Sequence, residues 1–351
     1  MNRKDFLSVA VPGGLALGVL GAGASASVGD FSGKMEERAR LSTKIPRFLT
    51  AGDTIGITVP AGYIRREDVL PAVAEMESWG FKVALGDTVG KKDFTFGGTD
   101  AERLADFQRM LDDPSIAAIM CARGGYGAVR IIDQLDFTQF KRHPKWVIGF
   151  SDITVFHCHF NRQLGVASIH SKMCNSFPSD PAKASALQVD TIQSIRKALT
   201  GVQMVYEAPA SADNRNGTAT GELVGGNLSI LQNLAGSVSQ LQTRNKILFV
   251  EDTGEYLYSI DRMFWNLKRA GMLDHLAGLL VGGFKVKPDD SDDPFGQTIQ
   301  EIVLSKVQGY SFPVAFDFPV GHQVNNFALR CGMRYRLEVG TSGTILTSIA
   351  D

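Results

Sequence analysis

Alternation of short apolar segments with amphipathic segments predicts an α/β protein whose first half contains a parallel sheet. The runs 54–59, 117–122 and 146–150 are apolar enough to be strands buried on both faces. Segments 66–79 and 101–111, which lie between them, have apolar residues at helical spacing. This alternation is typical of parallel sheets, whose ligands lie beyond the carboxyl ends of the strands. The chemistry of the protein is therefore expected at that edge.

Local signals support each predicted element of the first half. In the helix over 66–79, Val69, Val73 and Met76 share one face, and Pro71 lies in the first turns, where its missing N–H is tolerated. Thr99-Asp100 is a capping signal for the following helix. In order, the predicted elements are strand 54–59, helix 66–79, strand 81–85, helix 101–111, strand 117–122, helix 128–134, strand 146–150, a helix after Ser151 and strand 167–170.

A second domain is predicted after the segment 208–217, which consists of small, polar and turn-forming residues. The predicted domains are a linker over 27–47, an N-terminal α/β domain over 48–207 and a C-terminal domain over 218–351. The predicted elements of the last are a helix packed through Leu231 and Leu234, strand 246–250, helix 260–270, a strand within 276–282, helix 298–307 and β-rich pieces at 314–318, 334–339 and 344–349.

Composition narrows the class of protein. Of the 351 residues, 44% are hydrophobic and 21% are charged, which is typical of a globular protein with ordinary cores. A formal net charge of −1 gives no indication of nucleic acid or an anionic membrane as partner. No internal run reaches the length of a membrane span. The cysteines lack the spacing of a zinc site or a disulfide framework, although a Cys158–Cys174 bridge is left open.

The N-terminus has the features of an export signal over 1–26. A basic start with Arg3-Lys4 precedes the apolar run 9–20, and Ala24-Ser25-Ala26 provides a cleavage site. The basic start is similar to a twin-arginine signal with one arginine replaced by lysine. We therefore expect export to the periplasm and no stable membrane insertion after cleavage. A cytoplasmic location is the alternative if the signal is not used, and a disordered tail or interfacial helix is the structural alternative.

Ser151 occupies the position of a nucleophile at a sharp strand-to-helix turn. The apolar run 146–150 ends directly before it, and Ile153, Phe156 and Phe160 then follow at helical spacing. Such an elbow exposes the hydroxyl at the carboxyl edge of a sheet and places free N–H groups of the new helix beside it. Ile153 stands where the usual G-x-S-x-G pattern has its second glycine. The alternative is that Ser151 only caps the helix.

A serine nucleophile requires a base, and the six histidines of the sequence supply the candidates. His157 and His159 are expected to point away from the turn because they lie on the helix that follows it. His170 ends a predicted strand at the reactive edge. His322 lies beside Gly321 in a loop after a strand, a common position for a catalytic base. The residues alone leave His170 and His322 open, and His322 could also be an ordinary surface histidine.

An orienting carboxylate is expected at the end of the predicted strand 246–250. Glu251, Asp252 and Glu255 follow this apolar run. A run of charge is usually a solvated face, but a carboxylate directly after a buried strand is held at the strand tip. That is a suitable position for the acid that orients a histidine.

Five segments together resemble the LD-carboxypeptidases, a family of serine peptidases that includes the microcin-C self-immunity hydrolases. They occur in the family's order, and the resemblance extends from Thr54 to the C-terminus. The matching segments are Arg123-Gly124-Gly125-Tyr126-Gly127, Gly149-Phe150-Ser151-Asp152-Ile153, Gly225-Gly226-Asn227-Leu228, Glu251-Asp252-Thr253-Gly254-Glu255 and Gly321-His322.

This resemblance implies a catalytic triad of Ser151, His322 and Glu251. It also implies an oxyanion hole made by the backbone N–H groups of Gly125 and Asp152. The implied architecture is a flavodoxin-like N-terminal domain and a smaller β-rich α/β C-terminal domain, commonly in a homodimer. No metal or other cofactor is implied. The export signal departs from the family, because many members act in the cytoplasm.

Substrate recognition is assigned to residues of the same segments. Gly124 and Gly125 would let the main chain approach a substrate carbonyl closely. A dinucleotide-binding loop is excluded because the spacing differs and the segment follows the third predicted strand instead of the first. Arg123 is the candidate that binds a free carboxylate, with a structural ion pair as the alternative. Asn227 is a further substrate-binding candidate.

The expected reaction is hydrolysis of the amide between an L-centre of a diamino acid and a terminal D-alanine in peptides derived from peptidoglycan. Two alternatives remain at this point. One is a peptidyl-nucleotide amidase of the microcin-immunity kind. The other is a non-catalytic exported solute-binding protein, because two α/β lobes with a cleft would suit that function too.

Overall fold

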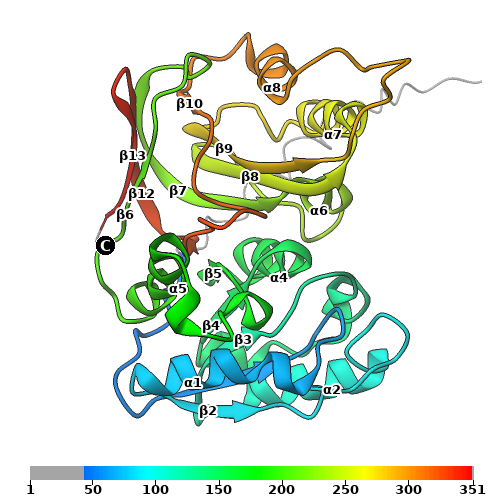
Figure 1. The fold of residues 1–351 in the computed structure, drawn as a ribbon, viewed down its shortest axis with the longest axis vertical. Helices are drawn as coiled ribbons and strands as arrows, with labels where there is room; N and C mark the ends of the chain where they lie inside the picture. The colour runs from blue at the N-terminus through cyan, green and yellow to red at the C-terminus, as the bar shows by residue number, and fades with distance from the viewer. Residues whose placement is uncertain (1–42, 350–351) are drawn as a thin grey trace, which may run out of the picture. The chain divides into compact units, whose positions relative to one another are not determined.

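The computed structural model describes residues 43–349, whose strands form two sheets (Figure 1). The predicted signal over 1–26 and most of the predicted linker lie outside the described residues. The first sheet has the order β11-β5-β4-β3-β1-β2, in which every pair is parallel except β11 with β5. Its strands are β1 Thr54–Thr58, β2 Lys82–Leu85, β3 Ile116–Cys121, β4 Trp146–Gly149, β5 Ser168–His170 and β11 Leu329–Cys331.

The order 2-1-3-4-5 of the first five strands is the doubly wound order of flavodoxin. Successive residues of the central strands enter different cores, as the pleat requires: Val147 packs on one face of the sheet and Ile148 on the other. Helices α1 and α5 contribute to the core on one face, and α2, α3 and α4 to the core on the other. The predicted α/β fold class with a flavodoxin-like first domain is confirmed.

The helices of this half follow the predicted sequence signals in most places. Thr99 and Glu102 form a capping box at the start of α2, as the sequence indicates. The predicted helix over 128–134 is wrong: two 3₁₀ turns, Ala128–Arg130 and Ile132–Gln134, occupy this segment instead of one continuous α-helix. Helix α5 was not predicted. The helices are α1 Leu70–Ser78, α2 Asp100–Asp112, α3 Thr138–Arg142, α4 Thr154–His159 and α5 Ala186–Leu199.

The second sheet has the order β10-β9-β8-β7-β12-β13-β6. Strands β7 to β10 are parallel, and β12, β13 and β6 extend the sheet in antiparallel pairs. The strands are β6 Val205–Ala208, β7 Gly217–Asn227, β8 Lys246–Glu255, β9 Gly278–Val286, β10 Val314–Ala315, β12 Arg334–Gly340 and β13 Gly343–Ser348. The helices of this half are α6 Leu228–Asn233, α7 Leu257–Arg269 and α8 Ile299–Val307.

The two sheets share a core and exchange strands. One face of β8 and β9, which includes Phe249 and Leu280, packs in the same hydrophobic core as Ile148 and Ile169 of the first sheet. Strand β6 lies before the predicted domain crossing but belongs to the second sheet, and β11 returns from the second half to the edge of the first. The boundaries 48–207 and 218–351 therefore stay predictions.

All four cysteines are buried and free, so the Cys158–Cys174 bridge that the sequence left open is not formed in this structure. Burial raises the pKa of the Cys174 thiol to about 12, which keeps it protonated and unreactive. Among residues 43–349, no helix has the length and apolar character needed to cross a membrane. The same residues contain no cluster of three or more metal-ligating side chains.

Candidate active site

Ser151 lies in a strained turn directly after β4. Its φ is +62°, in the left-handed region that residues other than glycine seldom adopt. The serine is the first residue of the 3₁₀ turn Ser151–Ile153, which continues into α4, and its hydroxyl caps neither helix. The capping alternative is therefore wrong. Strain of this kind at a serine between strand and helix is characteristic of a nucleophile elbow.

The segment 123–127, called the glycine loop because it contains Gly124, Gly125 and Gly127, follows β3 and packs directly against this elbow. A Cβ atom at Gly124 would lie 3.0 Å from Cβ of Ser151 and 3.3 Å from the carbonyl oxygen of Phe150. On the other side, the Gly62 N–H donates to the Gly124 carbonyl at 2.8 Å. Gly125 has a φ of +101°, which is also left-handed. The main chain of this loop can thus approach a group bound at Ser151 closely, because no side chain intervenes.

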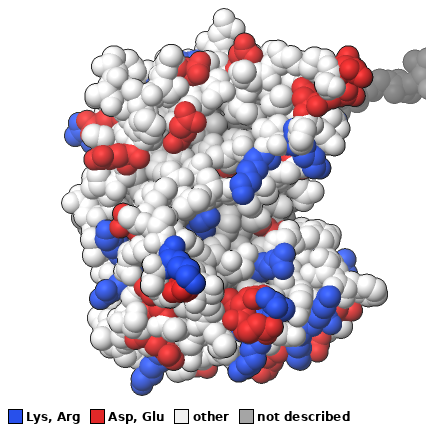
Figure 2. All heavy atoms as spheres, in the orientation of Figure 1, with Lys and Arg blue, Asp and Glu red and all other residues white. Residues whose placement is uncertain are grey.

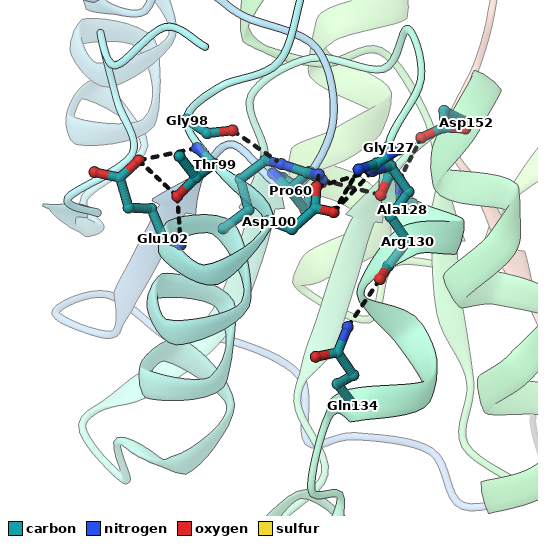
Figure 3. Close-up of polar contacts among 11 residues, drawn as sticks. Pro60, Gly98, Thr99, Asp100, Glu102, Gly127, Ala128, Arg130, Gln134 and Asp152 are labelled. Carbon is teal, nitrogen blue, oxygen red and sulfur yellow. Dashed lines mark hydrogen bonds and ion pairs between the residues drawn. The ribbon is translucent and has the colours of Figure 1, made fainter.

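Buried charged side chains hold the glycine loop in place (Figure 3). The Asp152 carboxylate accepts a hydrogen bond from the Ala128 N–H at 2.8 Å, and burial raises the pKa of Asp152 to about 6. The Arg103 guanidinium, fully buried, donates to the carbonyls of Gly127 at 2.9 Å and Pro60 at 2.5 Å. Asp152 of the elbow is therefore hydrogen-bonded to Ala128, directly after the glycine loop, and Arg103 of α2 is hydrogen-bonded to Gly127 within the loop.

Glu251 and His322 form a short hydrogen bond in the second half of the molecule. Nδ1 of His322 donates to Oε2 of Glu251 at 2.6 Å, since the carboxylate can only accept at neutral pH. Glu251 is fully buried in β8, whereas the His322 side chain remains partly exposed. This tautomer leaves Nε2 of His322 with a free lone pair, so the imidazole can act as a base.

Gly321 makes the approach of His322 to Glu251 sterically possible. A Cβ atom at Gly321 would lie 2.6 Å from Cβ of Glu251, and its φ of +111° is left-handed. The Gly321 N–H donates to Oδ1 of the buried Asn326 at 2.8 Å, and Gly321 forms a parallel bridge with Gly283 of β9. The loop before His322 is thus fixed against the second sheet.

The elbow and the His322 loop meet at Phe150. The centroids of the Phe150 and His322 rings are 4.8 Å apart, and Phe150 directly precedes Ser151. A further contact joins the helix after the elbow to the second sheet, because the Asn227 N–H donates to Oγ1 of Thr154 at 3.1 Å. Within residues 43–349, no hydrogen bond joins the Ser151 hydroxyl to His322. Such bonds often form fully only when substrate is bound.

Three further histidines are buried in the fold, and hydrogen bonds hold two of them in place. Nε2 of His157 donates to the Gly149 carbonyl at 2.9 Å, and its Nδ1 therefore accepts from the Ser168 hydroxyl at 2.8 Å. His159 bonds to the Ser239 hydroxyl at 2.9 Å. His170, the second candidate base, is fully buried against the ring of Phe249, and burial lowers its pKa well below the usual range.

The two predicted substrate-binding side chains have different surroundings. Arg123 is exposed, and its Nη1 donates to the Tyr63 carbonyl at 2.6 Å. Its structural partner is therefore a backbone carbonyl and not the carboxylate of the ion pair that was the alternative. Asn227 is buried: its Oδ1 accepts from the Ile230 N–H at 3.3 Å, and its Nδ2 donates to Asp252 at 3.0 Å. The Asn227 side chain therefore holds the β7–α6 corner, and its contact with substrate stays a prediction.

Two residues that contribute to this region, Lys172 and Arg103, were not predicted from the sequence. Lys172, two residues after β5, donates from Nζ to the Gln323 carbonyl at 2.5 Å, beside His322. The predicted strand 167–170 ends at the reactive edge, and this position could have indicated Lys172. Arg103 offers no such signal, because an arginine inside an amphipathic helix is usually on its solvated face.

A doubly wound α/β fold with a strained serine elbow and a histidine hydrogen-bonded to a buried glutamate defines the class of protein as a hydrolase. The LD-carboxypeptidase N-terminal domain matches residues 55–171, and the LD-carboxypeptidase C-terminal domain matches residues 220–337. The chain therefore belongs to the LD-carboxypeptidase family, and it is a peptidase of carboxypeptidase type.

Individual relatives agree with this membership. The probable murein peptide carboxypeptidase of Bacillus subtilis is 31% identical over 312 residues, which cover 86% of this chain and 93% of the relative. The crystal structure of the muramoyltetrapeptide carboxypeptidase of Oxalobacter formigenes superposes with a TM-score of 0.75 at 27% identity, over 85% of this chain and 99% of the other.

A microcin self-immunity protein of Escherichia coli is 24% identical, with 85% of this chain and 94% of the relative covered. Solved structures of such proteins, at 23% identity and a TM-score of 0.77, share the fold. The chain is thus similar to relatives of both kinds that the sequence suggests, and the murein peptide carboxypeptidase of Bacillus subtilis is more similar to it than this microcin self-immunity protein is.

Proposed function

We propose that the protein is a serine LD-carboxypeptidase that releases a terminal D-alanine from murein tetrapeptides. The substrate amide joins this residue to an L-centre of a diamino acid. The observation that carries the proposal is the left-handed φ of Ser151 at a strand-to-helix turn that lies next to the glycine loop and whose Phe150 ring lies against the ring of His322. Relatives named for murein peptides support the substrate class.

In the proposed reaction, the Ser151 hydroxyl attacks the scissile carbonyl carbon while Nε2 of His322 accepts the hydroxyl proton. Glu251 holds the imidazole in this tautomer and stabilises the imidazolium that forms, because its buried carboxylate accepts from Nδ1. The imidazolium then gives its proton to the amine of the leaving D-alanine. A water molecule, activated by the same histidine, releases the acyl group from Ser151.

The backbone N–H groups of Gly125 and Asp152 are the proposed donors to the oxyanion. Each such donor contributes on the order of 3 kcal/mol to lowering the barrier. Their positions depend on one another, since the Asp152 carboxylate bonds to Ala128 three residues after Gly125. The Ser151 strain supports this assignment, because a left-handed serine directs its hydroxyl and the next N–H toward the same space.

The test is release of D-alanine from a tetrapeptide by the protein and by its Ser151→Ala variant. The protein should release D-alanine from the stem whose penultimate residue has an L-centre at the scissile amide, and not from the stem with a D-centre there. The variant should lose at least four orders of magnitude in kcat, roughly the loss caused by removing the nucleophile in other serine peptidases. It should still bind the peptide.

Turnover retained by Ser151→Ala would remove Ser151 as nucleophile, and absence of D-alanine release by the unaltered protein would remove the proposed activity. Export to the periplasm and homodimer formation are further proposals. Export is tested by the location of the full chain in fractionated cells, and the dimer by the mass of the protein in solution.

A further inference from the structure

Lys172 lies where the nucleophile segment and the base loop meet. Its Nζ is 5.7 Å from the centroid of the Phe150 ring and 2.5 Å from the Gln323 carbonyl oxygen. Phe150 directly precedes Ser151, and Gln323 directly follows His322. The half-buried ammonium therefore contacts the residue before the proposed nucleophile and the residue after the proposed base.

The charge of this ammonium has no direct counter-ion. In the described part of the chain, neither Lys172 nor Lys285 forms an ion pair with a carboxylate, although Glu251 is near enough to act on Lys172 through its charge. Burial lowers the pKa of Lys172 to about 8, and repulsion from Lys285 contributes to this lowering. At neutral pH most of the Lys172 side chains are still charged. Figure 2 shows basic side chains on both sides of the hollow in this face of the molecule.

We propose that Lys172, assisted by Lys285, binds the free carboxylate of the substrate and so determines that the enzyme acts at a C-terminus. The inference rests on the proposed function. In a C-terminal substrate residue the carboxylate carbon is three bonds from the scissile carbonyl carbon. Its receptor must therefore lie close to Ser151, and Lys172 is the candidate because its Nζ lies over the ring of the preceding residue, Phe150. An ammonium has three N–H donors, and Gln323 uses one of them.

Lys172 suits this function better than Arg123. The Arg123 side chain is exposed to solvent, where an ion pair with substrate would contribute little, and one of its nitrogens already bonds to Tyr63. Lys172 is half-buried, has no competing carboxylate and is backed by a second cation. A charge-assisted hydrogen bond in such surroundings is stronger than at the surface.

The test compares a tetrapeptide that ends in D-alanine with the same peptide ending in D-alanine amide. Binding is measured by calorimetry to the Ser151→Ala protein, which cannot turn the peptide over. With Lys172 present, the acid should bind at least about tenfold more tightly than the amide, because one charge-assisted hydrogen bond contributes about 1.5 kcal/mol or more. With Lys172→Met added, the two affinities should become equal. Methionine keeps an apolar side chain over Phe150, so the packing there is preserved.

Lys268→Met is the matched control, because Lys268 lies over the Trp265 ring on α7, away from the elbow. This control should keep the preference for the acid, and Lys285→Met should reduce the preference by less than Lys172→Met does.

An unchanged preference in Lys172→Met, or an equal loss of affinity for acid and amide, would overturn the inference and leave Lys172 with a structural role. Release of D-alanine by the protein with Ser151 intact is measured in parallel and tests the proposed function separately. If that release is normal while Lys172→Met keeps its preference, the inference alone fails. If neither peptide binds and no D-alanine is released, both fail.

Discussion

The elbow region and the His322 region each position one proposed catalytic side chain, but they are built in different ways. Around Ser151, consecutive residues from β4 to α4 make the turn, and the strain lies in one φ angle. Around His322, two segments 71 residues apart are brought together, and a glycine with no room for a Cβ atom makes the contact possible. The nucleophile is thus placed by local structure, whereas the base is placed by tertiary packing.

This difference suggests that the two regions fail in different ways. A substitution near His322 should mainly alter the geometry of the base, because its loop depends on one close approach. A substitution beneath the elbow should mainly alter stability, because the turn is part of a buried sheet.

Gly321→Ala should damage the His322 region most. The added Cβ atom would lie 2.6 Å from Cβ of Glu251, and the φ of +111° is strained for alanine. The loop must shift, and a displacement of about 1 Å in the base lowers kcat by roughly a hundredfold. Steady-state kinetics on the tetrapeptide measure this loss.

Gly236→Ala is the control for backbone strain, since Gly236 has a φ of +84° and nothing within 4 Å of an added Cβ atom. It should cost about 1 kcal/mol in stability and leave kcat unchanged. Full activity in Gly321→Ala would contradict the claim that the close approach positions the base.

Asp152→Ala tests whether the elbow depends on its bond to the glycine loop. Without the carboxylate, the Ala128 N–H loses its partner and the loop that contains Gly125 is free to shift. Removing an oxyanion donor costs roughly 100- to 1,000-fold in kcat, so a displaced donor should cost about tenfold. Asp152→Asn keeps an oxygen acceptor and should retain most of the activity. Equal kinetics in Asp152→Ala and the unaltered protein would show that Gly125 is held by other contacts or has no catalytic role.

His157→Gln should leave kcat nearly unchanged but alter the pH dependence of stability. Burial lowers the pKa of His157 to about 4, against about 6.5 in the unfolded chain. Between these values the unfolded state binds more protons, so this histidine makes the free energy of unfolding fall as pH falls from 6.5 to 4. The slope is at most about 1.4 kcal/mol per pH unit, and the total is roughly 3 kcal/mol.

Urea unfolding at pH 7, 5.5 and 4.5 measures this effect as the difference between His157→Gln and the unaltered protein. That difference isolates His157, because the buried Asp152 and Asp252, whose pKa values burial raises to about 6, act with the opposite sign in both proteins. A difference that does not change with pH would contradict the prediction. A large loss of kcat at neutral pH would mean that the hydrogen bond from His157 to the Gly149 carbonyl is needed to hold the elbow in its active geometry.

Much of the fold could be predicted because its signals are local. The cap at Thr99 forms as the sequence indicates, and the central strands β3 and β4 are read directly from apolar runs. The short antiparallel strands β6 and β11 could not be predicted in the same way. Each is three or four residues long, and each exists through pairing with a strand far away in the sequence.

The sequence by itself determined the α/β class with a parallel first sheet, the turn at Ser151 and the family to which the chain belongs. These follow from periodicity, from a strand that stops at a serine and from motifs in a fixed order. The residues alone left His170 and His322 open, and the family resemblance implied His322, which the structure places on Glu251. Only the tertiary structure decided that Asn227 is buried and that Lys172 lies between Phe150 and Gln323. The physical reason is that burial and short hydrogen bonds between distant segments depend on how two sheets pack, and packing has no local pattern.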